Sequence, residues 1–360
     1  MDYENQYLAS IVFIIILLSV LTIVLPTKGI STTKGYDDYY EDYEDHEDHE
    51  NYKDESNSNI SKGKVLEDNM IIDTYFCPQD NCSQVLIALI LSSTDSIFCA
   101  FFDFDLVEID NLLKDKSKRI KVRLIVDGDN SLIKDREFII IENKSSFMHN
   151  KFCIFDKKIV LTGSTNPTIN GITKNNNNMV IIRSRYLARN YLEEFLELYQ
   201  GIYSKGNKVR NNKIVDLKNS IIIDNYFCPE DDCESMMLKA LKSSEKSIYF
   251  MTYSFTSDKI ANVLIKKHYQ NISIEGIFEK NMATQRSSVY SRLSFHNISV
   301  MLDKNPQIMH HKVFIVDSTT IITGSTNPTN NGLYKNDENI IIISHTPTAK
   351  IFIKEFQRLN

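Results

Sequence analysis

Residues 148–166 read MHNKFCIFDKKIVLTGSTN, and residues 309–327 read MHHKVFIVDSTTIITGSTN. Both stretches follow one pattern: His-x-Lys, four residues, Asp, six residues, then Gly-Ser-x-Asn. Six fixed identities at fixed spacing arise by chance at about one start position in 20 to the sixth power. Because the pattern occurs twice in one chain, the sequence predicts two copies of the same functional unit.

Each pattern predicts a strand and a returning strand that together carry one polar patch. His149 and Lys151 are two residues apart, so on a strand their side chains leave from the same face. Asp156 falls at a turn, and the chain then returns antiparallel and brings Ser164 and Asn166 beside the histidine. An imidazole, an ammonium and an amide on one patch make a phosphate site with a nucleophile or acid in reach.

Other matches extend the repeat to most of the chain. Residues 75–78 and 226–229 both read YFCP at an offset of 151, whereas the two histidine motifs are 161 apart. About ten residues are therefore inserted in the second copy, within residues 282–306. Each copy alternates expected strands and helices, which predicts an α/β sandwich in each half. In the first copy the expected strands are 70–76, 96–102 and 120–127, and the expected helices are 84–92 and 106–114.

These motifs resemble the paired HKD motifs of the phospholipase D superfamily over about residues 70–360. The runs 226–229 (YFCP) and 253–256 (YSFT), with Glu338-Asn339, look most like the small Nuc-type endonucleases, which pair two one-motif chains as a dimer. The resemblance implies two tandem phospholipase-D-like α/β sandwich domains related by pseudo-two-fold symmetry. Since both halves lie in one chain, the protein is expected to be monomeric.

The resemblance also implies a metal-independent reaction that needs no cofactor. One motif histidine attacks phosphorus to form a phosphohistidine, and the other protonates the leaving oxygen and later activates water. The implied catalytic residues are His149, Lys151, Asp156, His310, Lys312, Asp317 and Glu338. The implied phosphate-binding residues are Lys151, Ser164, Asn166, Lys312, Ser325 and Asn327. The two aspartates fit equally well as caps that order the hairpin turn.

The two halves differ at a position that supports a catalytic histidine in the family. The second half has Glu338 eleven residues after the motif asparagine, and the first half has Asn177 at the equivalent place. A carboxylate strengthens an imidazole as a nucleophile, whereas an amide can only orient it. We therefore expect His149 to be the nucleophile, with Glu338 reaching it across the interface. His311 is expected to face the other side of its strand and to be unimportant.

The net charge of −6 hides two very different segments. Residues 36–56 hold eleven carboxylates and one lysine, a charge of −10, and residues 1–35 are neutral, so residues 57–360 carry +4. Residues 7–25 are uncharged and apolar, long enough to span a bilayer, and lack the basic start and cleavage site of a signal peptide. The expected organisation is a flank (1–6), a transmembrane anchor (7–25), an acidic disordered linker (26–68), a first domain (69–205), a linker (206–219) and a second domain (220–360).

The six cysteines give a weak indication of compartment. Cys77 with Cys82 and Cys228 with Cys233 are candidates for local disulfides, which suit an oxidising compartment. One zinc site with four cysteines is the alternative, and the remaining two cysteines lie in expected core strands. Two lysines after the apolar span favour a cytoplasmic body instead. The side of the membrane stays open, with a slight preference for the extracytoplasmic side.

Three functions remain open from the sequence. The first is an endonuclease that cleaves DNA or RNA, which the basic body and the Nuc-like runs favour. The second is a membrane phospholipase D or a cardiolipin-synthase-like phosphatidyl transferase, which the apolar segment favours. The third is a non-catalytic phosphate-binding protein. Lys280, Arg286 and Arg292, in or beside the inserted segment, are expected to line a wall that selects the substrate.

Overall fold

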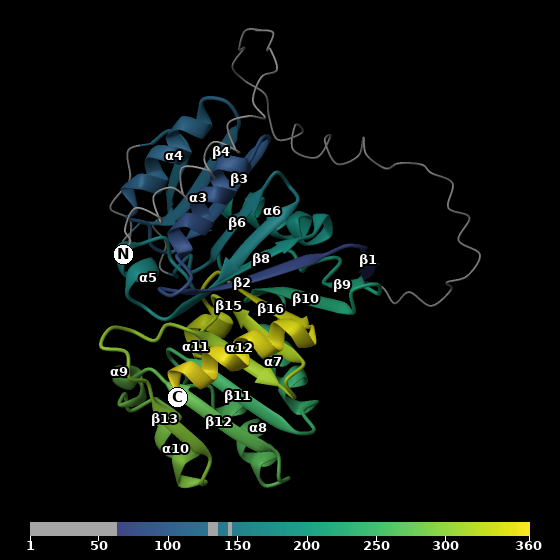
Figure 1. Cartoon of the computed structure of the whole chain (residues 1–360), viewed down its shortest axis with the longest axis vertical. Helices are drawn as coiled ribbons and strands as arrows, with labels where there is room; N and C mark the ends of the chain where they lie inside the picture. The colour runs from purple at the N-terminus through teal and green to yellow at the C-terminus, as the bar shows by residue number, and fades with distance from the viewer. Residues whose placement is uncertain (1–62, 129–135, 143–145) are drawn as a thin grey trace, which may run out of the picture. The chain divides into compact units, whose positions relative to one another are not determined.

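The computed structural model describes residues 63–128, 136–142 and 146–360, shown in colour in Figure 1. The expected anchor at residues 7–25 and nearly all of the acidic segment lie outside these residues. Within the part that is described, no helix is both long enough and apolar enough to cross a bilayer.

The first repeat is a seven-stranded mixed sheet with the order β2-β8-β7-β6-β3-β4-β5. The His-x-Lys strand β6 lies at its centre, between β7 and β3. The strands are β2 (Ile71–Cys77), β3 (Ser96–Phe101), β4 (Lys121–Asp127), β5 (Ile139–Glu142), β6 (Lys151–Phe155), β7 (Ile159–Gly163) and β8 (Asn177–Arg183). The helices are α3 (Cys82–Ser92), α4 (Val107–Ser117), α5 (Ile169–Thr173) and α6 (Arg185–Tyr199).

The second repeat has the same central strand order within a nine-stranded sheet, β1-β9-β10-β16-β15-β14-β11-β12-β13. Its strands are β1 (Lys64–Leu66), β9 (Lys213–Asp216), β10 (Ile221–Cys228), β11 (Ser247–Thr252), β12 (Ser273–Phe278), β13 (Ser299–Leu302), β14 (Lys312–Val316), β15 (Thr320–Gly324) and β16 (Glu338–Ser344). Its helices are α7 (Cys233–Lys242), α8 (Asp258–His268), α9 (Lys280–Ala283), α10 (Tyr290–Phe295), α11 (Asn330–Tyr334) and α12 (Thr346–Leu359).

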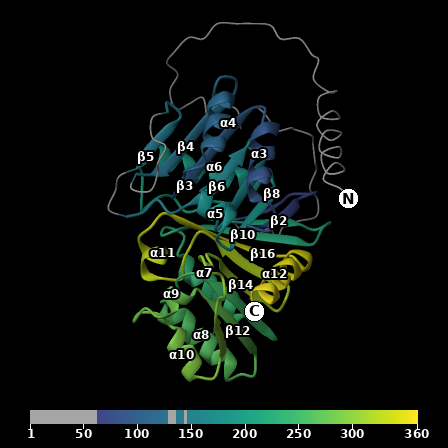
Figure 2. The same ribbon diagram turned by 60° about the vertical axis from the view of Figure 1, so that its left-hand side comes forward.

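Two short strands lie where the sequence suggested linkers. β1 pairs in parallel with β9, and β9 pairs antiparallel with β10, so both extend the second sheet (Figure 1). On its other side β10 pairs with β16, its neighbour in Figure 2. The Met70 backbone N–H donates to Asp216 Oδ2 at 2.8 Å, which fixes the start of β2 beside this edge. Strands of three and four residues are too short to show a two-residue period, so the sequence offered no signal for them.

One long helix from each repeat packs between the two sheets. On α6, Tyr191 packs against Phe152 of its own sheet and against Phe227 of the second repeat, with ring centroids 5.1 Å and 5.0 Å away. On α12, Phe352 packs against Phe76 of the first repeat at 5.1 Å. The contacts of Tyr191 with Phe227 and of Phe352 with Phe76 are equivalent under the repeat offsets. Buried aromatic pairs of this kind join the two halves into one body.

The two motif aspartates lie at the far end of the motif strands, away from the histidines. Asp317 follows the last residue of β14, and its carboxylate accepts the backbone N–H groups of Glu245, Lys246 and Ser247 at 2.9, 2.7 and 2.9 Å. Asp156 makes the equivalent contacts with residues 94–96. At about 3.3 Å per residue along the strand, neither carboxylate reaches the histidines. The structure therefore places both carboxylates in the capping position and not beside the histidines.

Asp317→Asn is expected to lower the free energy of unfolding by about 2 kcal/mol, the usual scale for hydrogen bonds to a charged group. Burial alone would raise the pKa of Asp317, but its bonds to backbone N–H groups outweigh burial and lower the pKa. A depressed carboxyl pKa stabilises the fold above the unfolded value of about 4, and this stabilisation disappears as the pH falls through the folded value. Urea unfolding at pH 7 and at pH 3 measures the effect.

The stability difference from wild type should be clear at pH 7 and should shrink at pH 3. Asp68→Asn, at an exposed position, is the matched control and should change little at either pH. An Asp317→Asn protein as stable as wild type at pH 7 would contradict the capping role.

Candidate active site

Each His-x-Lys segment is held by a backbone hydrogen bond from the other repeat. The His149 N–H donates to the Asp337 carbonyl at 2.9 Å, and the His310 N–H donates to the Asn176 carbonyl at 2.8 Å. The flanking residues complete two isolated parallel bridges, Met148 with Asp337 and Asn176 with Met309. The two motifs therefore meet at one place between the sheets, and neither repeat can form this site alone.

The imidazole rings are also oriented across the repeat boundary. His149 Nδ1 lies 2.8 Å from Glu338 Oε2, and the Glu338 carboxylate is fully buried. His310 Nδ1 lies 3.0 Å from Asn177 Oδ1 and 3.1 Å from the Ser164 carbonyl. A proton on each Nδ1 donates to these oxygens, which leaves Nε2 of both rings with a free lone pair.

Each motif lysine donates a hydrogen bond to the carbonyl of the histidine in its own motif and contacts an aromatic ring. Lys151 Nζ donates to the His149 carbonyl at 2.7 Å, and Lys312 Nζ donates to the His310 carbonyl at 3.0 Å. Each ammonium lies 5.1 Å from an aromatic centroid, that of Phe102 or Tyr253. These contacts fix both cations beside the imidazole rings.

Phe102 and Tyr253 are site residues that the motif analysis did not identify. Their rings lie 4.7 Å from the ring of His149 and 4.8 Å from that of His310. Both follow directly after β3 or β11, at the repeat offset of 151. The sequence signal for these two residues was the aromatic side chain that both halves carry directly after the equivalent strand.

Burial disfavours the charged form of each titratable group in the site. The pKa of His149 is lowered well below 6.5 by burial and by Lys151 and Lys312, and that of His310 is lowered by burial, the same lysines and His149. Burial lowers the pKa of Lys151 to about 7, against the opposing effect of Glu338. Burial raises the pKa of Glu338 to about 8, although both lysines oppose this shift. Because the two histidines, the two lysines and Glu338 shift one another's pKa values, these side chains lie close together. An anion bound among them would relieve the repulsion between the cationic groups.

The Gly-Ser-x-Asn residues divide into two roles. Asn166 and Asn327 each have a buried Oδ1 without a hydrogen-bond partner. Ser164 and Ser325 are fully buried. Ser164 Oγ donates to Asn177 Oδ1 at 2.9 Å, and Ser325 Oγ accepts the Asn339 N–H at 3.0 Å. The serines therefore position the residues that support the histidines, rather than facing a phosphate as expected.

Two asparagines form a polar network behind the site that joins the repeats. Asn339 Oδ1 accepts Thr162 Oγ1 at 2.7 Å, and Asn339 Nδ2 donates to Asn150 Oδ1 at 2.8 Å. In the equivalent network, Asn178 Oδ1 accepts Thr323 Oγ1 at 3.1 Å. Asn178 and Asn339 are separated by the repeat offset of 161, which was the sequence signal for this pair.

His311 belongs to the same buried layer. Its side chain is fully buried; Nδ1 lies 3.2 Å from Asn178 Nδ2, and Nε2 lies 3.2 Å from Glu355 Oε1. The expectation that it turns away from the His310 face fits these contacts, which also give the ring a structural place that the sequence did not indicate. A buried ring with partners on both nitrogens joins β8 of the first repeat to α12 of the second.

All six cysteines are in disulfides. Cys77 bonds to Cys82 and Cys228 to Cys233, in the local pairs that the sequence suggested, so the alternative zinc site has no thiolates to form it. The third disulfide joins the two remaining cysteines, Cys99 and Cys153, on adjacent strands β3 and β6. These two are buried as expected for core residues, but their bond was not foreseen. Their pairing requires the strand order, which the sequence alone did not give.

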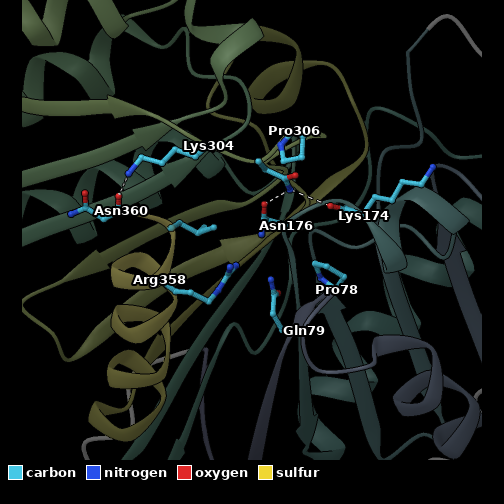
Figure 3. Close-up of a pocket in the computed structure, with 10 residues that line it drawn as sticks. Pro78, Gln79, Lys174, Asn176, Lys304, Pro306, Arg358 and Asn360 are labelled. Atoms are coloured by element: carbon cyan, nitrogen blue, oxygen red, sulfur yellow. Dashed lines mark hydrogen bonds between the residues drawn. The ribbon is translucent and has the colours of Figure 1, made fainter.

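A basic pocket of about 350 Å³ opens beside Asn176, which supports His310 (Figure 3). It lies between the Cys-Pro turn of the first repeat, the segment before the second motif and the end of α12. Lys174, Lys304 and Arg358 line it and are exposed to solvent. Its polar lining includes Asn305, which bonds to the Lys174 carbonyl at 3.1 Å.

The inserted segment supplies fewer free cations than expected. Arg292 is paired with Asp258 at 2.7 Å and also contacts Asn262. Lys280 Nζ donates to the Asn305 carbonyl at 2.6 Å. Arg286 is exposed. Two of the three basic residues therefore hold the segment in place, which limits their contribution to a substrate wall.

Comparison with known proteins points to one family. A family model described as "Cardiolipin synthase, PLD-like domain" matches residues 86–199 and 237–360. Mitochondrial cardiolipin hydrolase of Xenopus laevis is 30% identical over 135 residues, which are 37% of this chain and 64% of that relative. The chain thus spans less than two thirds of the length of that relative.

Two solved structures are also similar. Nuc from Salmonella typhimurium, a phospholipase D family member, is 29% identical; the match covers 39% of this chain and 93% of Nuc, with a TM-score of 0.37. Phosphatidylserine synthase from Haemophilus influenzae is 12% identical over 80% of this chain and 86% of its own, with a TM-score of 0.63. The second match shows that both halves of the fold are shared.

Lys151→Met is expected to stabilise the fold near pH 7 while removing a cation from the site. The charged lysine is disfavoured by burial, at about 1.4 kcal/mol for each unit of pKa depression. This exceeds the ~1 kcal/mol that the lost bond to the His149 carbonyl contributes. Because the folded pKa is about 7 and the unfolded value about 10.4, the gain should be full below pH 7 and disappear toward pH 10.

Thermal unfolding of both proteins at pH 6.5 and pH 9.5 measures this gain. Lys114→Met, at an exposed helix position, controls for the change of residue type and should show no such pH dependence. A Lys151→Met protein less stable than wild type at pH 6.5 would contradict the electrostatic account.

Proposed function

We propose, for a chain that belongs to the phospholipase D superfamily, that it is a metal-independent phosphodiesterase working through a phosphohistidine. The observation that carries the proposal is the convergence of two imidazoles, each oriented by the opposite repeat, with two ammonium groups held beside them by their own repeats. One imidazole bonds to a carboxylate and the other to an amide. Two rings with different partners suit two different roles in one reaction.

In the first step, His149 Nε2 attacks phosphorus while Glu338, in its ionised form, accepts the bond from Nδ1–H and stabilises the positive ring that forms. With a Glu338 pKa of about 8, the ionised form is the minor one at pH 7, and the developing positive charge on the ring favours it. The bond from phosphorus to the leaving oxygen breaks, and His310 donates a proton to that oxygen. In the second step, His310 removes a proton from water, which attacks phosphorus and breaks the N–P bond. Lys151, Lys312 and the two motif asparagines hold the phosphate oxygens through both steps.

The depressed pKa values fit the resting state of this cycle. A nucleophilic imidazole must be neutral, and burial with two nearby lysines keeps His149 neutral at physiological pH. His310 must carry a second proton, on Nε2, when it acts as the acid. The negative charge of a bound phosphodiester would raise its pKa and supply that state only when substrate is present.

We favour a single-stranded nucleic acid as the substrate. Phe147 is 44% exposed and packs against Phe102, which in turn contacts His149, so an accessible aromatic surface leads to the site. The basic pocket beside Asn176 lies on the side of His310. Aromatic faces for bases and cations for the backbone are the two features that single-strand binding uses.

A phospholipid is the second candidate. The relative from Xenopus laevis is named as a cardiolipin hydrolase, and the apolar residues 7–25 would place the body beside a bilayer. The exposed ring of Phe147 would suit an acyl chain as well as a base. For either substrate, the three disulfides favour a body in an oxidising compartment, outside the cytoplasm.

Substrate class is tested with the full-length chain in mild detergent, supplied with single-stranded DNA, RNA, or vesicles of phosphatidylcholine with cardiolipin. We expect cleavage of nucleic acid that is lost in His149→Ala. Release of soluble head groups or phosphatidic acid, with intact nucleic acid, would contradict the nuclease and support the lipid candidate. No turnover of any of them by a folded protein would leave the phosphodiesterase proposal without support.

Glu338→Gln is expected to slow formation of the covalent intermediate by about 10²-fold or more, on the scale of general acid–base effects. The amide keeps the size of the side chain but cannot stabilise the positive His149 ring. Rapid-quench trapping of the phosphoenzyme measures the rate. Asn177→Ala is the matched variant for the other ring and should affect turnover more than phosphorylation. Undiminished trapping in Glu338→Gln would mean that the carboxylate does not support the nucleophile.

A further inference from the structure

The pocket in Figure 3 has an equivalent on the other side of the repeat axis, and its side chains differ in charge. The repeat offsets relate Gln79 to Glu230, Asn176 to Asp337, and Arg358 to Glu197. Three positions that are neutral or cationic in one location are thus acidic in the other. The fourth pair, Glu355 and Glu194, is glutamate in both.

The pair Glu355 and Glu194 shows that the first repeat lacks the cation that binds this glutamate in the second. In the second repeat, Arg358 binds both oxygens of the Glu355 carboxylate, with Nε and a terminal nitrogen at 2.7 and 2.8 Å. In the first repeat, Glu197 takes the place of that arginine, so the equivalent carboxylate of Glu194 faces another carboxylate. Within the described residues, no lysine or arginine forms an ion pair with Glu194, Glu197, Glu230 or Asp337.

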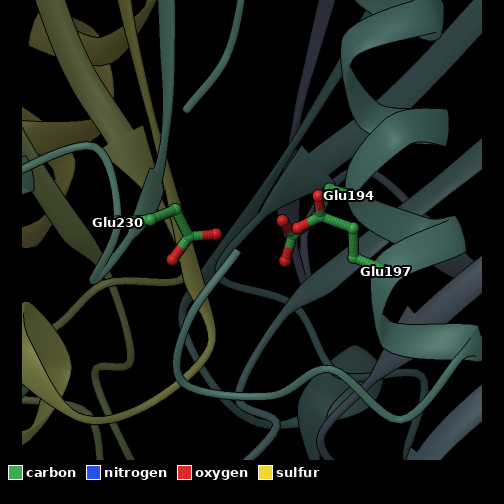
Figure 4. A group of neighbouring side chains, drawn as sticks. All are labelled: Glu194, Glu197 and Glu230. Carbon is green, nitrogen blue, oxygen red and sulfur yellow. The ribbon is translucent and has the colours of Figure 1, made fainter. Parts of the chain in front are cut away.

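The distances fit a metal ion. Figure 4 shows Glu194 and Glu197 pointing from α6 toward Glu230, which comes from the Cys-Pro turn of the second repeat. One carboxylate oxygen from each lies within 4.8 Å of the others. Calcium binds carboxylate oxygen at about 2.3–2.6 Å, so one ion can contact three oxygens with this spacing. Magnesium usually keeps several waters and binds through one or two carboxylates, so a site of three carboxylates suits calcium better.

A buried acceptor without a partner provides a second, separate observation. Asp337 is 2% exposed, its Oδ1 accepts the Ser204 N–H, and its Oδ2 has no hydrogen-bond partner. Its equivalent, Asn176, lines the pocket of Figure 3 beside Gln79 and Arg358. Asp337 is also close enough to Glu194 to raise the pKa of that side chain, after the larger effects of burial and Glu230. A buried carboxylate oxygen without a donor is costly unless a cation satisfies it.

We propose that Glu194, Glu197 and Glu230 bind one calcium ion between the two repeats, beside the buried Asp337 carboxylate and in the place that the Arg358 guanidinium occupies on the opposite side. The ion joins α6 of the first repeat to the Cys-Pro turn of the second. Carboxylates supply the ligands, and water completes the coordination.

The site lies directly behind the nucleophile proposed above. The carbonyl of Asp337 accepts the His149 N–H, and Glu338 is the next residue along the chain. Asn150 Nδ2 lies 3.4 Å from Glu194 Oε1. An ion here would fix the backbone that carries both members of the His149–Glu338 pair. It takes no part in the chemical steps, so calcium binding can be tested without any assumption about the substrate.

The test uses the full-length chain in detergent after chelation and dialysis, with calcium chloride as the probe. Calorimetric titration should show one site, and 5 mM calcium should raise the midpoint of thermal unfolding by about 3 °C or more. Glu230→Gln, which installs the residue of the opposite pocket, should weaken calcium binding at least tenfold. Glu193→Gln, on the same helix but paired with Arg189, is the control and should bind calcium as wild type does.

Glu197→Arg distinguishes a cation-binding site from an acidic surface that binds no specific ion. The arginine should reproduce the Arg358 arrangement, so this protein should unfold at a higher temperature than wild type in chelator and should no longer respond to calcium. Two results would overturn the proposal: no heat and no stabilisation of wild type at 5 mM calcium, or an unchanged calcium response in both Glu230→Gln and Glu197→Arg. Stabilisation of the chelated wild type by acid alone, without a calcium effect, would assign protons to these carboxylates instead.

Discussion

The arrangement of the site depends on one reciprocal contact, the pair of backbone hydrogen bonds that each His-x-Lys segment receives from the other repeat. His149 is bound to the Asp337 carbonyl and His310 to the Asn176 carbonyl. Because Glu338 and Asn177 follow these residues, the same contact sets the side chain that orients each ring. The Asn178 and Asn339 networks and the inner helices α6 and α12 reinforce it from behind. If the repeats were separated, both histidines would lose the backbone hydrogen bond that positions them and the side chain that orients their rings.

Electrostatics explain why such a site must be built into a rigid interface. Two lysines and two histidines are buried together, and burial disfavours the charged form of each. The fold tolerates this cost because the rest of the interface is well packed, and the repulsion is relieved when a phosphate anion enters. The buried cationic groups thus lower the stability of the fold, and they increase the affinity of the site for the negative charge that develops in the transition state.

Much of this could be predicted from the sequence, because the repeat shows each residue of the His-x-Lys and Gly-Ser-x-Asn motif twice. The motif spacing indicated the central hairpins, and the difference between Glu338 and Asn177 predicted a contact between repeats that the structure contains at 2.8 Å. The prediction was less successful where a role depends on direction. Asp156, Asp317, Ser164 and Ser325 belong to the motif, yet they bind backbone or supporting residues, because strand length and burial, rather than identity, decide what they reach. The Cys99–Cys153 bond and strands β1 and β9 needed the three-dimensional strand order.

The most direct test of the composite site is to locate the covalent intermediate. Bis-p-nitrophenyl phosphate has a leaving group that needs no proton, so a His310→Ala protein can still be phosphorylated but lacks the base for hydrolysis. After quenching in alkali, which preserves phosphohistidine, peptide mass spectrometry identifies the modified residue. The account predicts an adduct that accumulates on His149. An adduct on another residue, or none in a folded protein, would contradict the assignment of His149 as the nucleophile supported by Glu338.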